Sequence, residues 1–141
     1  MMAKSLQKDI DKALTELTVR DPLRRATAAA NLGVFGGADG IPALKKLLGD
    51  DSEYVKVSAL YSLVLLGEKD SVAKLLPFVG HKRDHFRKLA LTALENATAQ
   101  KHGGPHDDEA ACKDAQKAWE SWWAANGAKV AWDAEKRIWK A

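Results

Sequence analysis

DPLRRATAAANLGVFGGADGIPALKKLLGDD, residues 21–51, is followed by SEYVKVSALYSLVLLGEKDSVAKLLPFVGHK, residues 52–82, and the two segments repeat one pattern. When the sequence is shifted by 31 residues, Ala28 falls on Ala59, and Ala90 continues the column in a third unit. A fixed period of this length is typical of stacked helical repeats, in which neighbouring units bury a shared core. We therefore expect an all-α fold, a short α-solenoid of helical hairpins.

An amphipathic helix is predicted ahead of the repeats, over residues 4–18. Its apolar side chains recur at helical spacing: Leu6, Ile10, Leu14 and Leu17. Shifted by one period, Ile10 falls on Ile41, which belongs to the second helix of a repeat. This first helix is therefore expected to cap the N-terminal edge of the stack.

Capping residues predict where the repeat helices begin and end. Asp21-Pro22 opens a helix that runs to Phe35 before Gly36-Gly37, because aspartate and proline favour a helix start and glycine favours its end. Ser52 opens the next long helix, over residues 53–66. We expect Asp39 and Asp70 to cap the short second helices of the two full units.

The repeat pattern breaks at about residue 100, where glycine and proline at residues 103–105 predict a loop. Asp107 or Asp108 is expected to cap a last helix over residues 109–126. The tail from residue 128 to residue 141 predicts a small hairpin or an irregular wrap. We expect residues 1–99 to form the repeats with their capping helix, and residues 100–141 to form a tryptophan-rich cap on the same domain.

Five tryptophans lie in this C-terminal part of the chain: Trp119, Trp122, Trp123, Trp132 and Trp139. A stack of repeats must cover its last apolar face, and large aromatic side chains do so well. Aromatic side chains are also favoured anchors at interfaces. We expect three of the five to be buried as a cap and one or two to be partly exposed.

The repeats resemble the short bacterial HEAT repeats, also called phycobilisome-lyase HEAT-like repeats. The resemblance rests on the run from Asp21 to Ala28, then Asn31-Leu32-Gly33, then the segment from Gly40 to Leu44. It covers residues 21–97 and implies stacked pairs of helices. It implies no particular chemistry, since some members act on bilin chromophores, others bind proteins, and related repeats bind DNA. The tryptophan-rich tail also resembles the terminus of some bacterial HEAT-repeat proteins.

Composition points to a globular protein in a reducing compartment. The 141 residues are 46% apolar, carry a net charge of +3 and include one cysteine, Cys112, so no internal disulfide can form. The charge excess is too small to argue for extensive nucleic-acid binding. The N-terminal residues do not read as a signal peptide, and no stretch reaches the ~20 apolar residues of a membrane span. We expect a cytoplasmic protein.

A column of cations, one per unit, is the first candidate site: Arg25, Lys56 and Arg87. Because stacked helices lie about 10 Å apart, these side chains could form a ladder that docks phosphates or an acidic partner. A structural role is the alternative. The resemblance to HEAT repeats implies an arginine–aspartate pair here, and Asp50 and Asp51 are available.

Further basic residues fall into two groups. Lys82 and Arg83, beside His81, form a dense group on the turn before the third unit. Lys45, Lys46 and Lys74 lie on the short second helices, which normally line the concave side of such arrays. That mildly basic face would suit an acidic helix or tail of another protein.

The histidine pairs His81/His85 and His102/His106 have the spacing of shared metal ligands on a helix. The glycines and proline between the second pair prevent a helix there, and a zinc site needs more converging ligands. We therefore expect no metal and no cofactor. Nothing in the sequence marks a base beside Cys112, so we also expect no catalysis through its thiol.

The leading hypothesis is a non-catalytic adaptor that binds another protein through its concave face, as a monomer or weak homo-oligomer. The alternative is nucleic-acid binding through the basic residues of the repeats, namely Arg25, Lys56, Lys82, Arg83, Arg87 and Lys88. A third hypothesis, bilin handling, comes from the family resemblance alone.

Overall fold

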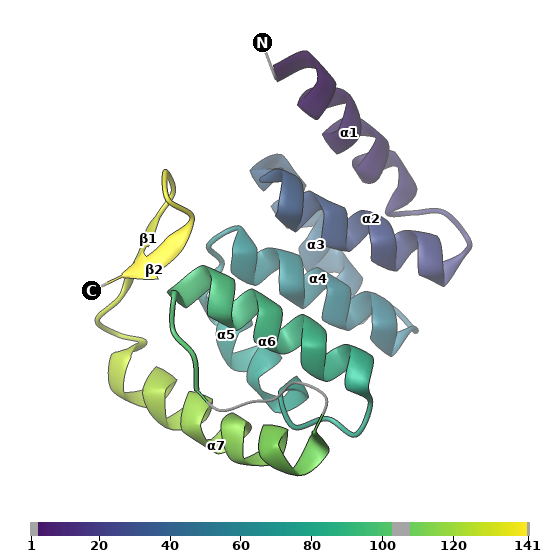
Figure 1. Ribbon diagram of the computed structural model, residues 1–141. Helices are drawn as coiled ribbons and strands as arrows, with labels where there is room; N and C mark the ends of the chain where they lie inside the picture. Colours follow the sequence, from purple (N-terminus) through teal and green to yellow (C-terminus); the bar gives the residue numbers. More distant parts are fainter. Residues whose placement is uncertain (1–2, 103–107, 141) are drawn as a thin grey trace. The chain divides into compact units, whose positions relative to one another are not determined.

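The computed structural model describes residues 3–102 and 108–140, and within these residues the chain forms seven α-helices and one β-hairpin (Figure 1). The all-α repeat architecture predicted from the period is confirmed. Contacts divide the chain into two units, Met1–Leu66 and Gly67–Ala141, and each is described by itself.

The first unit contains four α-helices and two single turns of 3-10 helix. In chain order they are α1 (Ala3–Glu16), α2 (Pro22–Phe35), η1 (Ala38–Gly40), α3 (Ile41–Lys46), η2 (Leu47–Gly49) and α4 (Glu53–Leu65). α1 packs along α2, and α2 packs along α4 (Figure 1). The buried faces come from the alanine and leucine columns of the repeat, since Ala28, Leu32, Ala59 and Leu63 are at most 1% exposed.

α2 and α4 approach each other closely at Gly33. The backbone N–H of Gly33 donates a hydrogen bond to the Ser62 hydroxyl at 3.0 Å, and the same hydroxyl donates to the carbonyl of Ala29. A Cβ atom at position 33 would lie 2.6 Å from the Cα of Ser62. The packing of the first unit therefore depends on the absence of a side chain at Gly33.

Three predicted helix caps are confirmed and two are wrong. Side chains of Asp21, Ser52 and Asp108 accept hydrogen bonds from backbone N–H groups at the starts of α2, α4 and α7. Asp39 instead lies inside the 3-10 turn η1, so that α3 begins only after Gly40. Asp70 lies within the first turn of α5, two residues after Glu68, which occupies the cap position. The other proposed cap, Asp107, and the loop predicted at residues 103–105 fall outside the described residues.

The second unit contains three α-helices, one 3-10 turn and the hairpin. They are α5 (Lys69–Leu75), η3 (Leu76–Phe78), α6 (Asp84–Thr98), α7 (Glu109–Asn126), β1 (Ala131–Asp133) and β2 (Ile138–Lys140). α7 packs on η3, and β2 packs on α6. Cys112, Ala115 and Trp119 form the buried stripe of α7, each at most 1% exposed.

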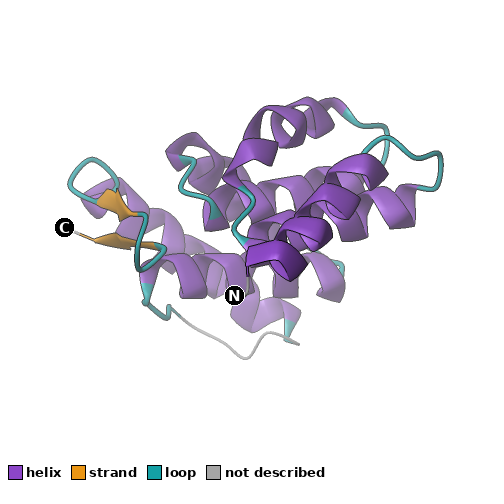
Figure 2. Ribbon diagram, turned by 90° about the horizontal axis from the view of Figure 1, so that it is seen from above, coloured by secondary structure: helices purple, strands orange, loops and turns teal. Residues whose placement is uncertain are grey.

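The C-terminal tail forms a hairpin, which is one of the two structures that the sequence left open, and not an irregular wrap. Its two strands, orange in Figure 2, pair antiparallel with Trp132 opposite Trp139. Trp119 and Trp139 are buried, whereas the other three tryptophans are half-buried. Two of the five tryptophans are therefore fully covered, where three were expected to be.

None of the helices within residues 3–102 and 108–140 has the length and apolar character that crossing a bilayer requires.

Candidate functional site

Arg25, the first member of the cationic column, closes the turn that precedes its own helix. Its guanidinium donates to Asp50 through Nε and Nη2, at 3.0 and 3.1 Å, and its Nη1 donates to the carbonyls of Val19 and Arg20 at 2.9 and 2.7 Å. This is the planar, bidentate geometry for which arginine is suited. The predicted ion pair with an aspartate is confirmed, with Asp50 as the partner.

Arg87, which lies in Gly67–Ala141, contacts the carbonyl groups at the corresponding positions of its own turn. Its Nη1 donates to the carbonyls of His81 and Lys82 at 2.9 and 3.0 Å, which are the residues that correspond to Val19 and Arg20. Asp84 adds an ion pair at 3.5 Å, and the Arg87 side chain is only 5% exposed. Each arginine thus binds carbonyl groups that no helix ladder satisfies, and most of its donors are engaged inside its own unit.

Electrostatics at Asp50 fit this arrangement. Burial alone would raise the pKa of the Asp50 carboxyl, but hydrogen bonds from Arg25 and from the Ser52 N–H outweigh burial and hold the pKa below its usual value. Lys56, the remaining residue of the cationic column, is half-buried, and its charge also lowers the pKa of Asp50. Two of the three column residues therefore act in turn closure, and Lys56 acts on the same carboxylate.

The remaining predicted basic residues are exposed to solvent. Lys45 and Lys46 lie in the last turn of α3, and Lys74 lies in the last turn of α5. Lys82 and Arg83 are exposed on the turn before α6, where the backbone N–H of Arg83 donates to Nδ1 of His81. Lys88, predicted only for nucleic-acid binding, is also exposed and lies 3.2 Å from Asp84.

The histidines within the described residues pack against aromatic rings. His81 stacks on Phe78 and meets Phe86 edge-on, with ring centroids 5.7 and 4.9 Å apart. His102 meets Trp119 edge-on at 4.7 Å. The described residues contain no group of three or more histidine, cysteine or acidic side chains that could hold a metal ion. His106, the partner proposed for His102, lies outside the described residues.

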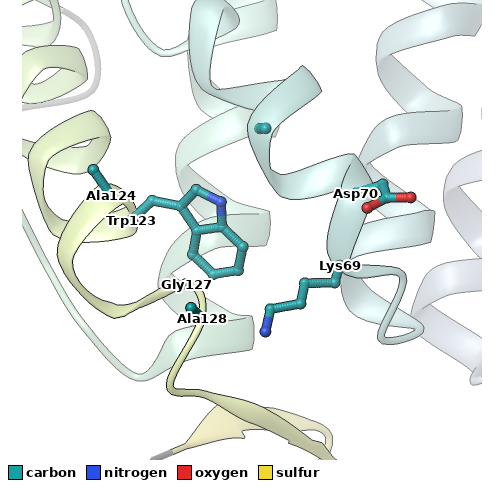
Figure 3. Close-up of a pocket in the computed structure, with 7 residues that line it drawn as sticks. Lys69, Asp70, Trp123, Ala124, Gly127 and Ala128 are labelled. Atoms are coloured by element: carbon teal, nitrogen blue, oxygen red, sulfur yellow. The ribbon is translucent and has the colours of Figure 1, made fainter.

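A pocket of about 440 Å³ opens between the start of α5 and the end of α7 (Figure 3). α5 contributes Lys69, Asp70 and Ala73, and the α7 end contributes Trp123 and Gly127. Trp123 and Lys69 extend toward each other across the pocket in Figure 3, whereas the Asp70 carboxylate points away from Trp123. The pocket thus combines an aromatic wall with an ammonium group.

Both polar and aromatic walls of the pocket are held in place. The Lys69 ammonium donates to the carbonyl of Val130 at 3.0 Å. The Trp123 ring packs at 6.3 Å from buried Trp139 and lies against Gly127, where an added Cβ would be 2.9 Å from the ring atom Cε2. The sequence predicted Trp123 as part of the cap and left an interface role open, but it gave no sign of Lys69, because no local pattern reports that residues so far apart in the chain meet.

A second pocket, of about 230 Å³, lies between α1 and α2. Lys12 and Glu16 line it from α1, and Asn31 and Phe35 line it from α2. Glu16 is engaged by Arg24 at 2.7 Å, on the surface. Because the pocket holds charges of both signs, it favours neither an acidic nor a basic ligand.

A family model described as HEAT repeats matches residues 10–95 of the chain. The match spans α1 to α6, which are the helices built on the 31-residue period. Comparison with curated proteins and with solved structures found no match.

Proposed function

The chain belongs to the HEAT-repeat family, and on that basis we propose that it is a non-catalytic adaptor that binds an acidic segment of another protein through its second helices. HEAT repeats commonly mediate protein–protein interaction. The proposed docking residues are the exposed lysines of α3 and α5, which are the short second helices of their repeats. They are Lys45, Lys46 and Lys74.

One observation carries this choice of surface. Arg25 and Arg87 are engaged in turn closure, and the side chains of Lys45, Lys46 and Lys74 are exposed. A cationic ladder along the first helices would need the guanidinium groups of both arginines, and Arg87 is only 5% exposed. The same observation removes two of the six residues on which nucleic-acid binding was predicted to depend.

Charge reversal tests the proposal. The chain is immobilised and exposed to lysate of its native host as wild type, as the double variant Lys45→Glu/Lys46→Glu, and as the control Lys113→Glu/Lys117→Glu on α7. All four lysines are exposed, and the two double variants change the net charge of the chain by the same amount. We expect a protein partner to be recovered with the wild type and the control and lost with the α3 variant.

Equal recovery with all three proteins would show that α3 is not the docking surface. A gel-shift titration with duplex DNA and with RNA runs in parallel. Phosphate binding weakens steeply as the salt concentration rises. A salt-sensitive shift that survives Lys45→Glu/Lys46→Glu would replace the adaptor proposal with nucleic-acid binding through Lys82 and Arg83.

A further inference from the structure

We propose that the pocket between Lys69 and Trp123 binds one apolar side chain of a peptide, aromatic or large aliphatic, together with a neighbouring carboxylate group. The site would anchor the acidic segment of the partner. The inference deepens the adaptor function and rests on it for the presence of a protein partner. The pocket lies within the second unit and contains none of the lysines of α3.

Trp123 forms the aromatic wall of the pocket. Its indole is half-buried, and its packing against Trp122 and Trp139 leaves the side toward α5 facing the pocket (Figure 3). A ring held this way loses little freedom when a ligand arrives, so stacking or apolar contact costs little ordering entropy. Tryptophan in a pocket is among the most effective anchors at protein interfaces.

Small residues keep the space beside this ring open. Ala73 lines it from α5, and Ala124, Gly127 and Ala128 line it from the end of α7. The alanines are exposed, so the pocket can be entered from solvent. Its volume of about 440 Å³ is sufficient for one large side chain and an adjoining carboxylate.

Lys69 places a positive charge in the pocket. An ammonium group has three N–H donors, and the Val130 carbonyl at 3.0 Å accepts one of them. That bond holds the ammonium at the edge of the pocket, where further donors can reach a ligand carboxylate. The Asp70 carboxylate points away from the ring (Figure 3), so the apolar wall and Lys69 together favour an anionic, apolar ligand.

The test uses two probes that differ only in charge, N-acetyl-L-phenylalanine and its uncharged amide. Binding is followed on the full chain through the indole N–H signals of the tryptophans in proton–nitrogen NMR spectra, with Trp123 assigned from Trp123→Phe. For ligands of this size we expect dissociation constants on the order of 1 mM. The carboxylate form should shift the Trp123 signal saturably and bind about two- to fivefold more tightly than the amide.

Two matched variants separate charge from shape. Glu and Lys have similar helix propensities and sizes at the exposed position Ala73, so Ala73→Glu and Ala73→Lys disturb the fold equally. We expect Ala73→Glu to weaken binding of the carboxylate probe at least threefold and Ala73→Lys to preserve it. In Lys69→Met, the carboxylate and the amide should bind equally.

Two results would overturn the inference. If neither probe shifts the Trp123 signal, the pocket is not an anchor site. If the carboxylate and amide bind the wild type equally, and Ala73→Glu and Ala73→Lys have the same effect, the carboxylate part of the inference is wrong. Either failure leaves the recovery experiment with Lys45→Glu/Lys46→Glu untouched, because that surface lies outside the pocket.

Discussion

The indole ring of Trp132 lies directly over the Cα atom of Gly67. Gly67 adopts a left-handed backbone conformation with φ of 89°, and a Cβ atom added there would lie 2.5 Å from Cδ1 of Trp132. The hairpin that carries Trp132 is thereby positioned on the turn before α5. The position therefore requires glycine twice over, for its backbone conformation and for the space above it.

Gly67→Ala is accordingly expected to destabilise the protein by about 2–4 kcal/mol, because the new methyl group is strained at positive φ and displaces Trp132. The free energy of unfolding in urea measures the effect. Gly49→Ala is the control, since a Cβ there meets no atom within 4 Å, and its change should stay within about 0.5 kcal/mol. Equal stability of the two variants would contradict the packing of Trp132 on Gly67.

Gly33→Ala should likewise destabilise the first unit by about 2–4 kcal/mol, because the added methyl group would meet the backbone of Ser62 and force α2 away from α4. Thermal unfolding monitored by circular dichroism measures the shift. The control is Val34→Ala, the next residue of α2, which is 54% exposed. If Gly33→Ala melts together with this control, the two helices are not in contact at this point.

The role of Arg87 in turn closure can be tested against the docking role that the sequence left open. Arg87→Ala leaves the carbonyls of His81 and Lys82 without their donor, and we expect a loss of about 2–4 kcal/mol. Lys82→Ala removes only an exposed side chain and should cost less than about 0.5 kcal/mol. The free energy of unfolding of both variants in urea distinguishes the two roles, since replacing a residue that serves only in docking would leave stability unchanged.

The hairpin carries a pH-dependent ion pair. The Lys140 ammonium, 2.8 Å from Asp133, and the N–H groups of Lys136 and Glu135 lower the pKa of the Asp133 carboxyl from 3.8 to about 2. Because the folded-state pKa lies below the unfolded value, the pair stabilises the hairpin above about pH 4. That contribution is lost as the pH falls toward 2.

Carboxyl carbon NMR of Asp133 follows this titration directly. Lys140→Met should raise the pKa of Asp133 toward its ordinary value, but only part of the way, because the two backbone N–H donors remain. Lys113→Met removes a similar surface lysine from α7 and should leave the titration of Asp133 unchanged. An unaltered pKa in Lys140→Met would show that the ion pair does not form in solution.

The 31-residue period was sufficient to predict the helices of the repeats, because the buried alanine and leucine positions recur with that period. Caps were predicted where a long helix follows a turn directly, as at Asp21 and Ser52. The prediction was wrong at Asp39, where a 3-10 turn precedes the helix and takes up the aspartate. Such single turns cost little free energy, and local sequence does not distinguish them from a helix start.

The pocket at Trp123 lay beyond sequence reasoning for a different reason. Its two walls belong to α5 and to the end of α7, and only the packing of the second unit brings Lys69 near Trp123. By contrast, the pairing of Arg25 with Asp50 was predictable because the resemblance to HEAT repeats implies an arginine–aspartate pair at this position. Contacts within the regular repeats could thus be predicted from the sequence, whereas contacts made by the irregular tail could not.

Cys112, the single cysteine of the chain, is enclosed in the buried stripe of α7. Thiol-reactive reagents would therefore act on a newly introduced surface cysteine well before they reach the native one. Ala128→Cys would place such a handle at the mouth of the Trp123 pocket without first removing Cys112. A photoreactive label attached there would join covalently to whatever protein docks, and mass spectrometry of the joined peptides would identify it by sequence.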